Sequence, residues 1–289
     1  MSLPDQTPIP VTLPSGITLN YVRSGAGPAL IFIHGAMGDW RSWGPQWQAF
    51  LPHFDCVTYS RRYSDPNPNP MNTRSHNALV DAEDLLGLMD ALGIEKAVLV
   101  GSSYGGFTAL ATGLKAPARV QAIVAVEAPM MRYAQMTSEG AATAQAFLKT
   151  SALPAREAFE RGDNEKAVQI LTGGIVGRDP QEIPPEVMAR RMRNVQAARS
   201  LALSDDEFPL LDPKALAQLP MPILLMSGAQ TAPVHAAIFA NVSNVLDRAR
   251  VRIVEGAGHS VSQQKPQVFN KEVLSFLRDH SLTKAPLKA

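Results

Sequence analysis

The stretch "VLVGSSYGGFTAL", residues 98–110, is an apolar run that opens into small residues and then resumes as a helix-forming sequence. Gly101 to Gly105 match the pattern G-x-S-x-G, with Ser103 at the centre. The apolar run before it is typical of a β-strand and the segment after it of a helix. An ordinary small-residue turn is the alternative, but the strand–turn–helix frame favours a nucleophile at Ser103. Ser102 is interpreted as a packing residue.

Strand-like runs alternate with helical patterns along most of the chain, which indicates βαβ units and a mostly parallel sheet. The predicted strands are 17–22, 29–35, 55–60, 97–101, 120–127, 222–228 and 250–256. The predicted helices lie near 40–51, 76–92, 105–116, 233–248 and 266–280. We expect the first run to pair with "PVTLP" as an antiparallel hairpin through "PSG".

Residues 130–209 interrupt this rhythm, because they contain no convincing strand and are rich in Ala, Glu, Gln, Arg and Met. A segment of that length is too long to be a loop in a compact domain. The sequence therefore predicts a helical insertion after the sixth strand, with an internal turn at 178–185. The remaining 1–129 and 210–289 form the predicted α/β core.

Composition excludes several classes of partner. The chain has 289 residues, with 27 Lys and Arg against 26 Asp and Glu and a net charge of +1, so nucleic acid and anionic membranes are not expected partners. The single cysteine, Cys56, allows no intrachain disulfide and no cysteine-rich metal site. No apolar segment of signal-peptide or membrane-spanning type is recognised. We expect a cytoplasmic protein, monomer or homodimer, that acts on a small molecule.

A serine hydroxyl is a weak nucleophile until a base takes its proton. Among six histidines, His259 in "EGAGHSVSQQKP" is the candidate base, because it follows the last predicted strand and comes after Ser103 in the chain. That position lies in a loop over the carboxyl edge of a parallel sheet. His34 is interpreted as structural. The other four histidines, His53, His76, His235 and His280, are expected at the surface.

The strand end "IFIHGAMGDW" offers a further part of an acyl-transfer site. The backbone N–H groups of Ala36 and Tyr104 could form an oxyanion hole, whose donors stabilise the negative charge on an attacked carbonyl oxygen. The side chains expected to contact the substrate are Met37, Trp40, Tyr104 and Met130. Core packing is the alternative for Trp40, which shares a helical face with Trp43 and Trp47, and for Met130.

With "HGAMG", "GSSYGG" and "GAGHS" in this order at the edges of predicted strands, the sequence resembles the α/β-hydrolase superfamily with a helical cap over the core. The resemblance implies a doubly wound, eight-stranded sheet, a substrate pocket between core and cap, and hydrolysis without a cofactor or metal. Members of this shape hydrolyse esters, lactones, amides or carbon–carbon bonds.

The acid that orients the histidine is out of its usual place. In the superfamily it commonly follows the strand read here as 222–228, but no carboxylate lies between Asp212 and Asp247, and Thr231 stands near the expected position. Glu127 closes the preceding strand, a placement similar to that in some haloalkane dehalogenases. We therefore expect Glu127 to be the acid, with a solvated strand-end carboxylate as the alternative. The reserve candidates are Asp205, Asp206 and Glu207.

These observations predict a serine hydrolase that cleaves a small, largely apolar carboxylic ester or lactone through an acyl-enzyme. Two alternatives stay open: carbon–carbon bond hydrolysis by the same three residues, and a non-catalytic ligand-binding protein on a hydrolase scaffold. Epoxide hydrolysis or dehalogenation by the superfamily's usual route needs an Asp at position 103, so Ser103 argues against both.

Overall fold

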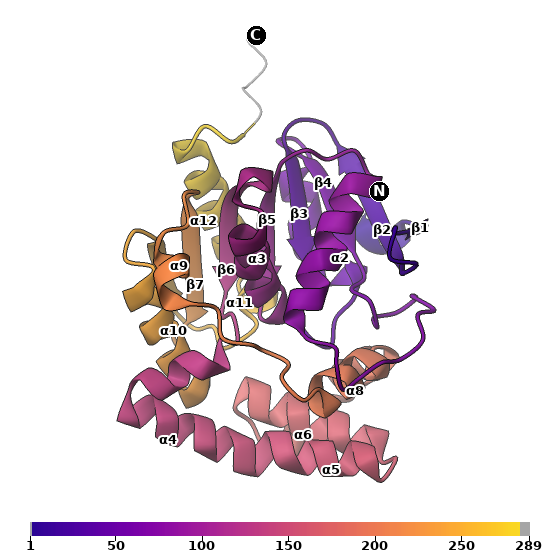
Figure 1. The fold of residues 1–289 in the computed structure, drawn as a ribbon, viewed down its shortest axis with the longest axis vertical. Helices are drawn as coiled ribbons and strands as arrows, with labels where there is room; N and C mark the ends of the chain where they lie inside the picture. The colour runs from indigo at the N-terminus through magenta and orange to yellow at the C-terminus, as the bar shows by residue number, and fades with distance from the viewer. Residues whose placement is uncertain (1, 284–289) are drawn as a thin grey trace.

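An eight-stranded sheet runs through the middle of the computed structural model, which describes residues 2–283 (Figure 1). The strands lie in the order β1-β2-β4-β3-β5-β6-β7-β8. β1 and β2 form an antiparallel hairpin, β2 pairs antiparallel with β4, and the remaining pairs are parallel. The strands are β1 Ile9–Thr12, β2 Thr18–Gly25, β3 Ala29–Ile33, β4 Asp55–Tyr59, β5 Ala97–Ser102, β6 Val120–Val126, β7 Ile223–Gly228 and β8 Arg250–Val254.

Helices cover both faces of this sheet, as expected for a doubly wound fold (Figure 1). One face is packed by α2 (Ala78–Ala91), α3 (Tyr104–Lys115), α9 (Pro213–Ala217) and α10 (Pro233–Val245). The other is packed by α1 (Gly44–Phe50), α11 (Val261–Gln264) and α12 (Pro266–Asp279), with the 3₁₀ turn η2 (Trp40–Trp43). Two further 3₁₀ turns are η1 (Leu3–Asp5) and η3 (Pro117–Arg119).

The alternation of side chains along the strands divides the core into two apolar layers. Ile31 and Ile33 of β3 point to the α2 and α3 side, whereas Leu30 and Phe32 point to the opposite side. Phe32 stacks on Trp43, with ring centroids 4.9 Å apart. Because both faces of β3, β5, β6 and β7 are buried, these strands are apolar almost throughout, whereas the edge strand β8 is mostly exposed and contains Arg250 and Arg252.

The chain between β6 and β7 forms a helical layer below the sheet in Figure 1. Its elements are η4 (Met131–Met136), α4 (Ser138–Phe147), the π-helical segment η5 (Leu148–Ala152), α5 (Leu153–Glu160), α6 (Asn164–Val176), η6 (Pro180–Glu182), α7 (Pro185–Arg193) and α8 (Val195–Leu203). The helical layer has its own apolar cluster, centred on Phe159, Val168 and Ala198. Met37, which belongs to the core, packs into this cluster. The division into 1–129, 130–209 and 210–289 remains a prediction.

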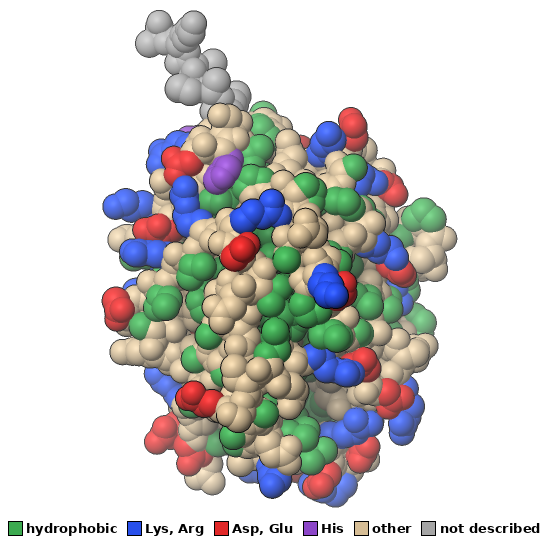
Figure 2. All heavy atoms as spheres, turned by 60° about the vertical axis from the view of Figure 1, so that its left-hand side comes forward, with side chains coloured by type: hydrophobic (Ala, Val, Ile, Leu, Met, Phe, Trp, Pro, Cys, Tyr) green, Lys and Arg blue, Asp and Glu red, His purple; other side chains and the backbone are tan. Residues whose placement is uncertain are grey.

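The observed elements agree closely with those expected from the sequence. The hairpin forms, the predicted strands are present, and 178–185 is a turn around η6. The 40–51 segment differs, because Asp39 caps η2 before α1 begins. Acidic and basic side chains are interspersed on the face that Figure 2 shows, in keeping with the net charge of +1. None of the helices in the described part of the chain is both long enough and apolar enough to cross a bilayer.

Candidate active site

Ser103 lies on the sharp turn between β5 and α3. Its backbone has φ 52° and ψ −121°, a strained conformation for a residue with a side chain, and its N–H donates to the Val126 carbonyl (2.7 Å). A Cβ on Gly101 would overlap the backbone of Gly105, and a Cβ on Gly105 would overlap the carbonyl oxygen of Ile33. The chain can therefore make this turn only because both flanking positions are glycine.

His259 and Glu127 form a buried hydrogen-bonded pair. The distance from His259 Nδ1 to Glu127 Oε2 is 2.6 Å. Glu127 Oε1 also accepts from the Ser227 hydroxyl (2.8 Å) and the Gly228 N–H (2.9 Å). Burial alone would raise the pKa of the Glu127 carboxyl, but its hydrogen bonds, first that with His259, lower this pKa to about 2. Because an ionised carboxylate only accepts, Nδ1 carries the proton and Nε2 is left as the basic atom.

Thr231, just after β7, contacts the carboxylate of Glu127, just after β6. It stands in the turn after β7, and its hydroxyl donates to Glu127 Oε2 (2.7 Å). Glu127 itself follows β6 directly and adopts φ 45°, which is uncommon for a residue other than glycine. Val126 and Met226 are register partners in β6 and β7, so the two strands end side by side. A carboxylate on β6 thus reaches the site that a residue after β7 would occupy.

The side chains of Ser103 and His259 line one cavity of about 150 Å³. Within residues 2–283 no hydrogen bond joins the two side chains. Ala36, a predicted oxyanion donor, lines the same cavity, and its carbonyl accepts from Arg61 Nη2 (3.2 Å). Tyr104, the other predicted donor, is the first residue of α3, where a helix leaves its N–H without an intrahelical acceptor.

The structure places three predicted substrate contacts away from this cavity. Trp40 is buried in the layer with α1 and α12, and Met130 in the layer with α3 and α10. The Tyr104 ring points into the core, where its hydroxyl donates to Asp81 Oδ2 (2.7 Å) and Arg61 lies 3.6 Å from the ring centre. Of the four predicted side chains, Met37 lines the cavity.

His76 and His235 are buried, so the expectation that they lie at the surface is wrong. His235 stacks on His259, with ring centroids 4.3 Å apart and planes 30° apart. Burial, and then the neighbouring His259, lower the pKa of His235 to about 3, so its ring is neutral. The position of His235 in the first turn of α10, four residues after Thr231, is the signal that would have placed it here.

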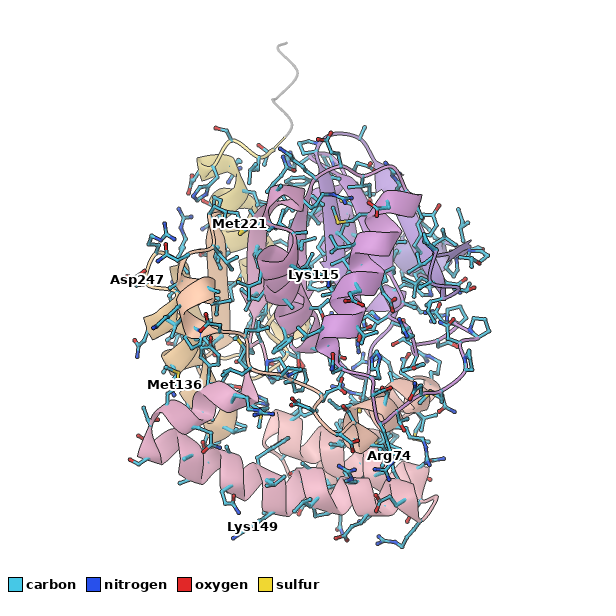
Figure 3. All side chains as sticks on the ribbon, in the orientation of Figure 1. Arg74, Lys115, Met136, Lys149, Met221 and Asp247 are labelled. Carbon is cyan, nitrogen blue, oxygen red and sulfur yellow. The ribbon has the colours of Figure 1, made fainter. Side chains whose placement is uncertain are left out.

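The reserve acids lie elsewhere. Asp205 pairs with Arg74 (3.5 Å), at the lower right in Figure 3, and Asp206 pairs with Arg132 (2.8 Å). Glu207 lines a small cavity beside Tyr104 rather than the one beside His259.

Three of the buried groups offer metal ligands. Glu127, His235 and His259 each present one ligand atom, and these atoms lie within 4.8 Å of one another. A cation that took both Glu127 and His259 as ligands would replace the hydrogen bond between them. In the structure, Glu127 and His259 are joined directly by that hydrogen bond.

The cavity lining also contains side chains that were not anticipated from the sequence. The helical layer contributes Ile175, Arg190, Arg191 and Arg193, and the loop after β3 contributes Asp39 and Arg41. The expected aromatic and aliphatic lining is limited to Ala36, Met37, Trp43 and Ile175. A run "ARRMR" on a helix is ordinarily a solvent-exposed face, so only the fold could place these arginines here.

Comparisons with known proteins find relatives that match most of the chain. The carboxylesterase YbfK of Bacillus subtilis is 28% identical over 260 residues, 86% of this chain and 80% of the relative. Its crystal structure matches with a TM-score of 0.69 at 24% identity, covering 94% of this chain and 92% of that one. The 2-(acetamidomethylene)succinate hydrolase of Mesorhizobium japonicum is 25% identical over 279 residues, 90% of this chain and 92% of the relative.

A third relative is the 2-hydroxy-6-oxo-6-phenylhexa-2,4-dienoate hydrolase of Comamonas testosteroni, 25% identical over 91% of this chain and 92% of its own length. The model of the alpha/beta hydrolase family matches residues 30–272. Because that match spans most of the chain, and the sheet order and nucleophile turn accord with it, the protein belongs to the alpha/beta hydrolase family.

Proposed function

We propose that this protein is a serine hydrolase in which Ser103 is the nucleophile, His259 the base and Glu127 the acid that orients His259. The observation that carries the proposal is the buried His259–Glu127 hydrogen bond of 2.6 Å beside a cavity that also contains the strained Ser103 turn. Each residue has a role that its surroundings support.

In the proposed reaction, Ser103 Oγ attacks the substrate carbonyl carbon while His259 Nε2 takes the hydroxyl proton. The backbone N–H groups of Ala36 and Tyr104 donate to the oxygen that becomes negative. His259 then returns the proton to the departing alcohol, and the acyl group remains on Ser103. A water molecule repeats the cycle: it gives its proton to His259, attacks the acyl carbon, and releases the acid as Ser103 regains its proton.

The substrate class we propose is a small carboxylic ester or lactone. A relative described as a carboxylesterase supports an ester, while the dienoate hydrolase among the relatives keeps carbon–carbon bond hydrolysis as the alternative. The expectation of a largely apolar substrate has little support, because four arginines line the cavity. Residues 130–209 act as a cap in this proposal, since they supply Ile175 and three of those arginines.

Labelling of the active serine tests the proposal. We expect Ser103→Ala to abolish both reaction with a fluorophosphonate probe and hydrolysis of p-nitrophenyl esters, since Oγ is the attacking atom. Glu127→Gln should lower kcat by up to about four orders of magnitude, the loss known when the acid behind a triad histidine is made neutral. In-gel fluorescence and p-nitrophenolate release measure the two effects.

Ser102→Ala is the matched control, because it removes the neighbouring hydroxyl and leaves the turn in place; its labelling should persist. Absence of both labelling and turnover in the wild-type protein would favour a non-catalytic ligand-binding protein. Full activity in Glu127→Gln would assign the acid to another residue.

A further inference from the structure

The cavity beside Ser103 is strongly cationic. Arg41, Arg190, Arg191 and Arg193 line it, and Asp39 is its single carboxylate among the lining residues. Asp39 is already engaged, since it accepts from the Arg41 N–H (2.9 Å), from Arg41 Nη1 (3.2 Å) and from Asn194 Nδ2 (3.1 Å). The positive charges of the three α7 guanidinium groups are therefore not neutralised by a carboxylate of the cavity lining.

No carboxylate pairs with Arg190, Arg191 or Arg193 anywhere in the part of the chain that the structure describes. The Nε of Arg191 is buried and has no hydrogen-bond partner. Burial, and then the charge of Arg190, lower the pKa of the Arg191 guanidinium to about 10. Arg191 as a whole is half-buried, and a partly desolvated cation without a partner is costly, so an anion that binds there offsets part of that cost.

Elsewhere the chain pairs its buried arginines. Arg61 lies 3.0 Å from Asp81, and Arg62 lies 2.7 Å from Asp84. Arg191 differs from these two in having no carboxylate within salt-bridge distance and a buried Nε without a hydrogen-bond partner.

A second cavity extends this cationic lining away from the nucleophile. It has a volume of about 530 Å³, shares Arg190, Arg191 and His259 with the first cavity, and adds Arg178 and Lys265. None of the residues that line it is acidic. An anionic molecule would thus meet only attractive charges on this path to His259.

We propose that the substrate carries a carboxylate, which Arg191 and Arg190 bind while the carbonyl to be cleaved lies at Ser103. The planar guanidinium donates two parallel hydrogen bonds to a carboxylate, a geometry that suits this anion. Ser103, Arg190 and Arg191 all line the first cavity, which has a volume of about 150 Å³, so a chain of a few atoms between carboxylate and reacting carbonyl is the spacing to test first. Short monoesters of dicarboxylic acids fit this description; the assignment of the reacting carbonyl rests on the proposed function.

A matched pair of esters tests this inference. Mono-p-nitrophenyl glutarate and p-nitrophenyl butyrate share a leaving group and differ in the terminal carboxylate. We expect the wild-type kcat/KM to favour the glutarate ester at least about tenfold, and Arg191→Gln to reduce that preference by about 10- to 100-fold, mainly through KM. Arg191→Lys keeps the positive charge but loses the two parallel donors, so its preference for the glutarate ester should lie between those of the wild type and Arg191→Gln.

Arg161→Gln is the control for a lost positive charge on the helical layer. Its side chain is 66% exposed and lies 3.8 Å from Glu157, away from the cavity lining, so the preference should match that of the wild type. A wild-type enzyme without preference for the glutarate ester, or an Arg191→Gln preference within twofold of the wild type, would overturn the inference.

Binding without turnover separates the two proposals. Calorimetric titration of glutarate into the Ser103→Ala protein should show binding that Arg191→Gln removes. If the wild-type protein reacts with no fluorophosphonate and cleaves neither ester, yet binds glutarate through Arg191, the hydrolase proposal fails and the carboxylate site stands. If the protein is labelled but glutarate does not bind, the carboxylate site fails and the hydrolase proposal stands.

Discussion

In the proposed triad Glu127 is the acid, on a strand other than the usual one, and four hydrogen-bond donors surround its carboxylate. Its Oε2 accepts hydrogen bonds from His259 Nδ1 and from the Thr231 hydroxyl. Thr231 thus lies where the acid usually lies, but it donates a hydrogen bond to the carboxylate of Glu127. Its Oε1 receives Ser227 and Gly228. Four donors thus hold one carboxylate, which keeps it ionised and its two oxygens oriented.

His235 is the residue whose role can be tested most directly. Its ring stacks on His259 at 4.3 Å, and its Nε2 is buried without a partner. We expect His235→Ala to lower kcat by about 2- to 10-fold, because a ring contact contributes about 0.5–1.5 kcal/mol to holding the His259 plane. His235→Phe keeps a flat ring and loses no hydrogen bond at Nε2, so it should restore most of kcat. Steady-state kinetics over about pH 5–8, the range in which an imidazole changes charge, measures the effect.

The comparison between the two variants separates positioning from folding. If His235→Phe lowers kcat as much as His235→Ala while both melt near the wild-type temperature, the imidazole nitrogens and not the ring contact are what His259 needs.

The residues of the candidate site differed in how far the sequence alone could locate them. Ser103, Glu127 and His259 each follow a predicted strand, and the carboxyl ends of parallel strands share one edge of a sheet, so their proximity could be inferred. His235, in the first turn of the helix after β7, could be placed at the same edge. Arg191 lies on α7 of the helical layer, and its distance from Ser103 depends on how that helix packs over the edge. No local pattern contains that information.

At the scale of elements, the junction between β5 and α3 depends on close approach of backbone to backbone. We expect Gly105→Ala to destabilise the protein by about 1–3 kcal/mol or to prevent folding, since its Cβ would overlap the carbonyl oxygen of Ile33 in β3. Urea unfolding followed by circular dichroism measures the change.

Gly44→Ala is the matched control for that substitution. Gly44 has helical φ −49° and ψ −47°, and a Cβ there would meet nothing closer than Pro4 at 3.9 Å. Alanine should be neutral or stabilise by up to about 1 kcal/mol at such a site. Equal stability of the two variants would mean that the turn tolerates a side chain and that the glycine pattern has another cause.

The elements of the core were predictable, whereas the arrangement of the helical layer was not. Each core strand is an apolar run, and each helix between strands has a start or stop signal, such as Asn77, which caps α2. In the helical layer, α7 has no fully buried residue and α4 continues through η5 into α5. The packing of such helices depends on contacts of Thr172 with Met37 and of Asn194 with Asp39, residues that are distant in sequence.

At the scale of the whole molecule, a buried ionic cluster connects the nucleophile helix to the segment that returns from the helical layer. Asp81 of α2 accepts from Arg61 (3.0 Å), His76 (3.0 Å) and the Tyr104 hydroxyl (2.7 Å). Arg61 and the histidine hold the pKa of Asp81 well below its usual range against the effect of burial. Glu207 of the returning segment lines the same small cavity as Arg61, His76 and Tyr104.

Glu207 has the opposite shift. Burial, to which the negative charge of Asp81 adds, raises the pKa of its carboxyl well above the ordinary value of 4.5. A carboxyl that is harder to ionise in the folded state contributes stability that is fully present below the unfolded pKa and is lost as the pH rises towards the folded pKa. The free energy of unfolding should therefore carry a term from Glu207 that falls as the pH rises above about 4.5, the ordinary pKa of the carboxyl.

Glu207→Gln is expected to remove that term, because the amide stays neutral and nearly isosteric. Relative to the wild type, the variant should gain stability on going from pH 5 to pH 8, by at least about 1 kcal/mol for each pKa unit of the shift spanned. The difference in unfolding free energy between wild type and variant isolates the effect of Glu207. The buried His34 and His235, whose pKa values are lowered, titrate equally in both proteins, so their contributions cancel. Urea unfolding at the two pH values measures it, with exposed Glu186→Gln as the control. A difference that is the same at both pH values would mean that Glu207 ionises normally and that the returning segment opens to water.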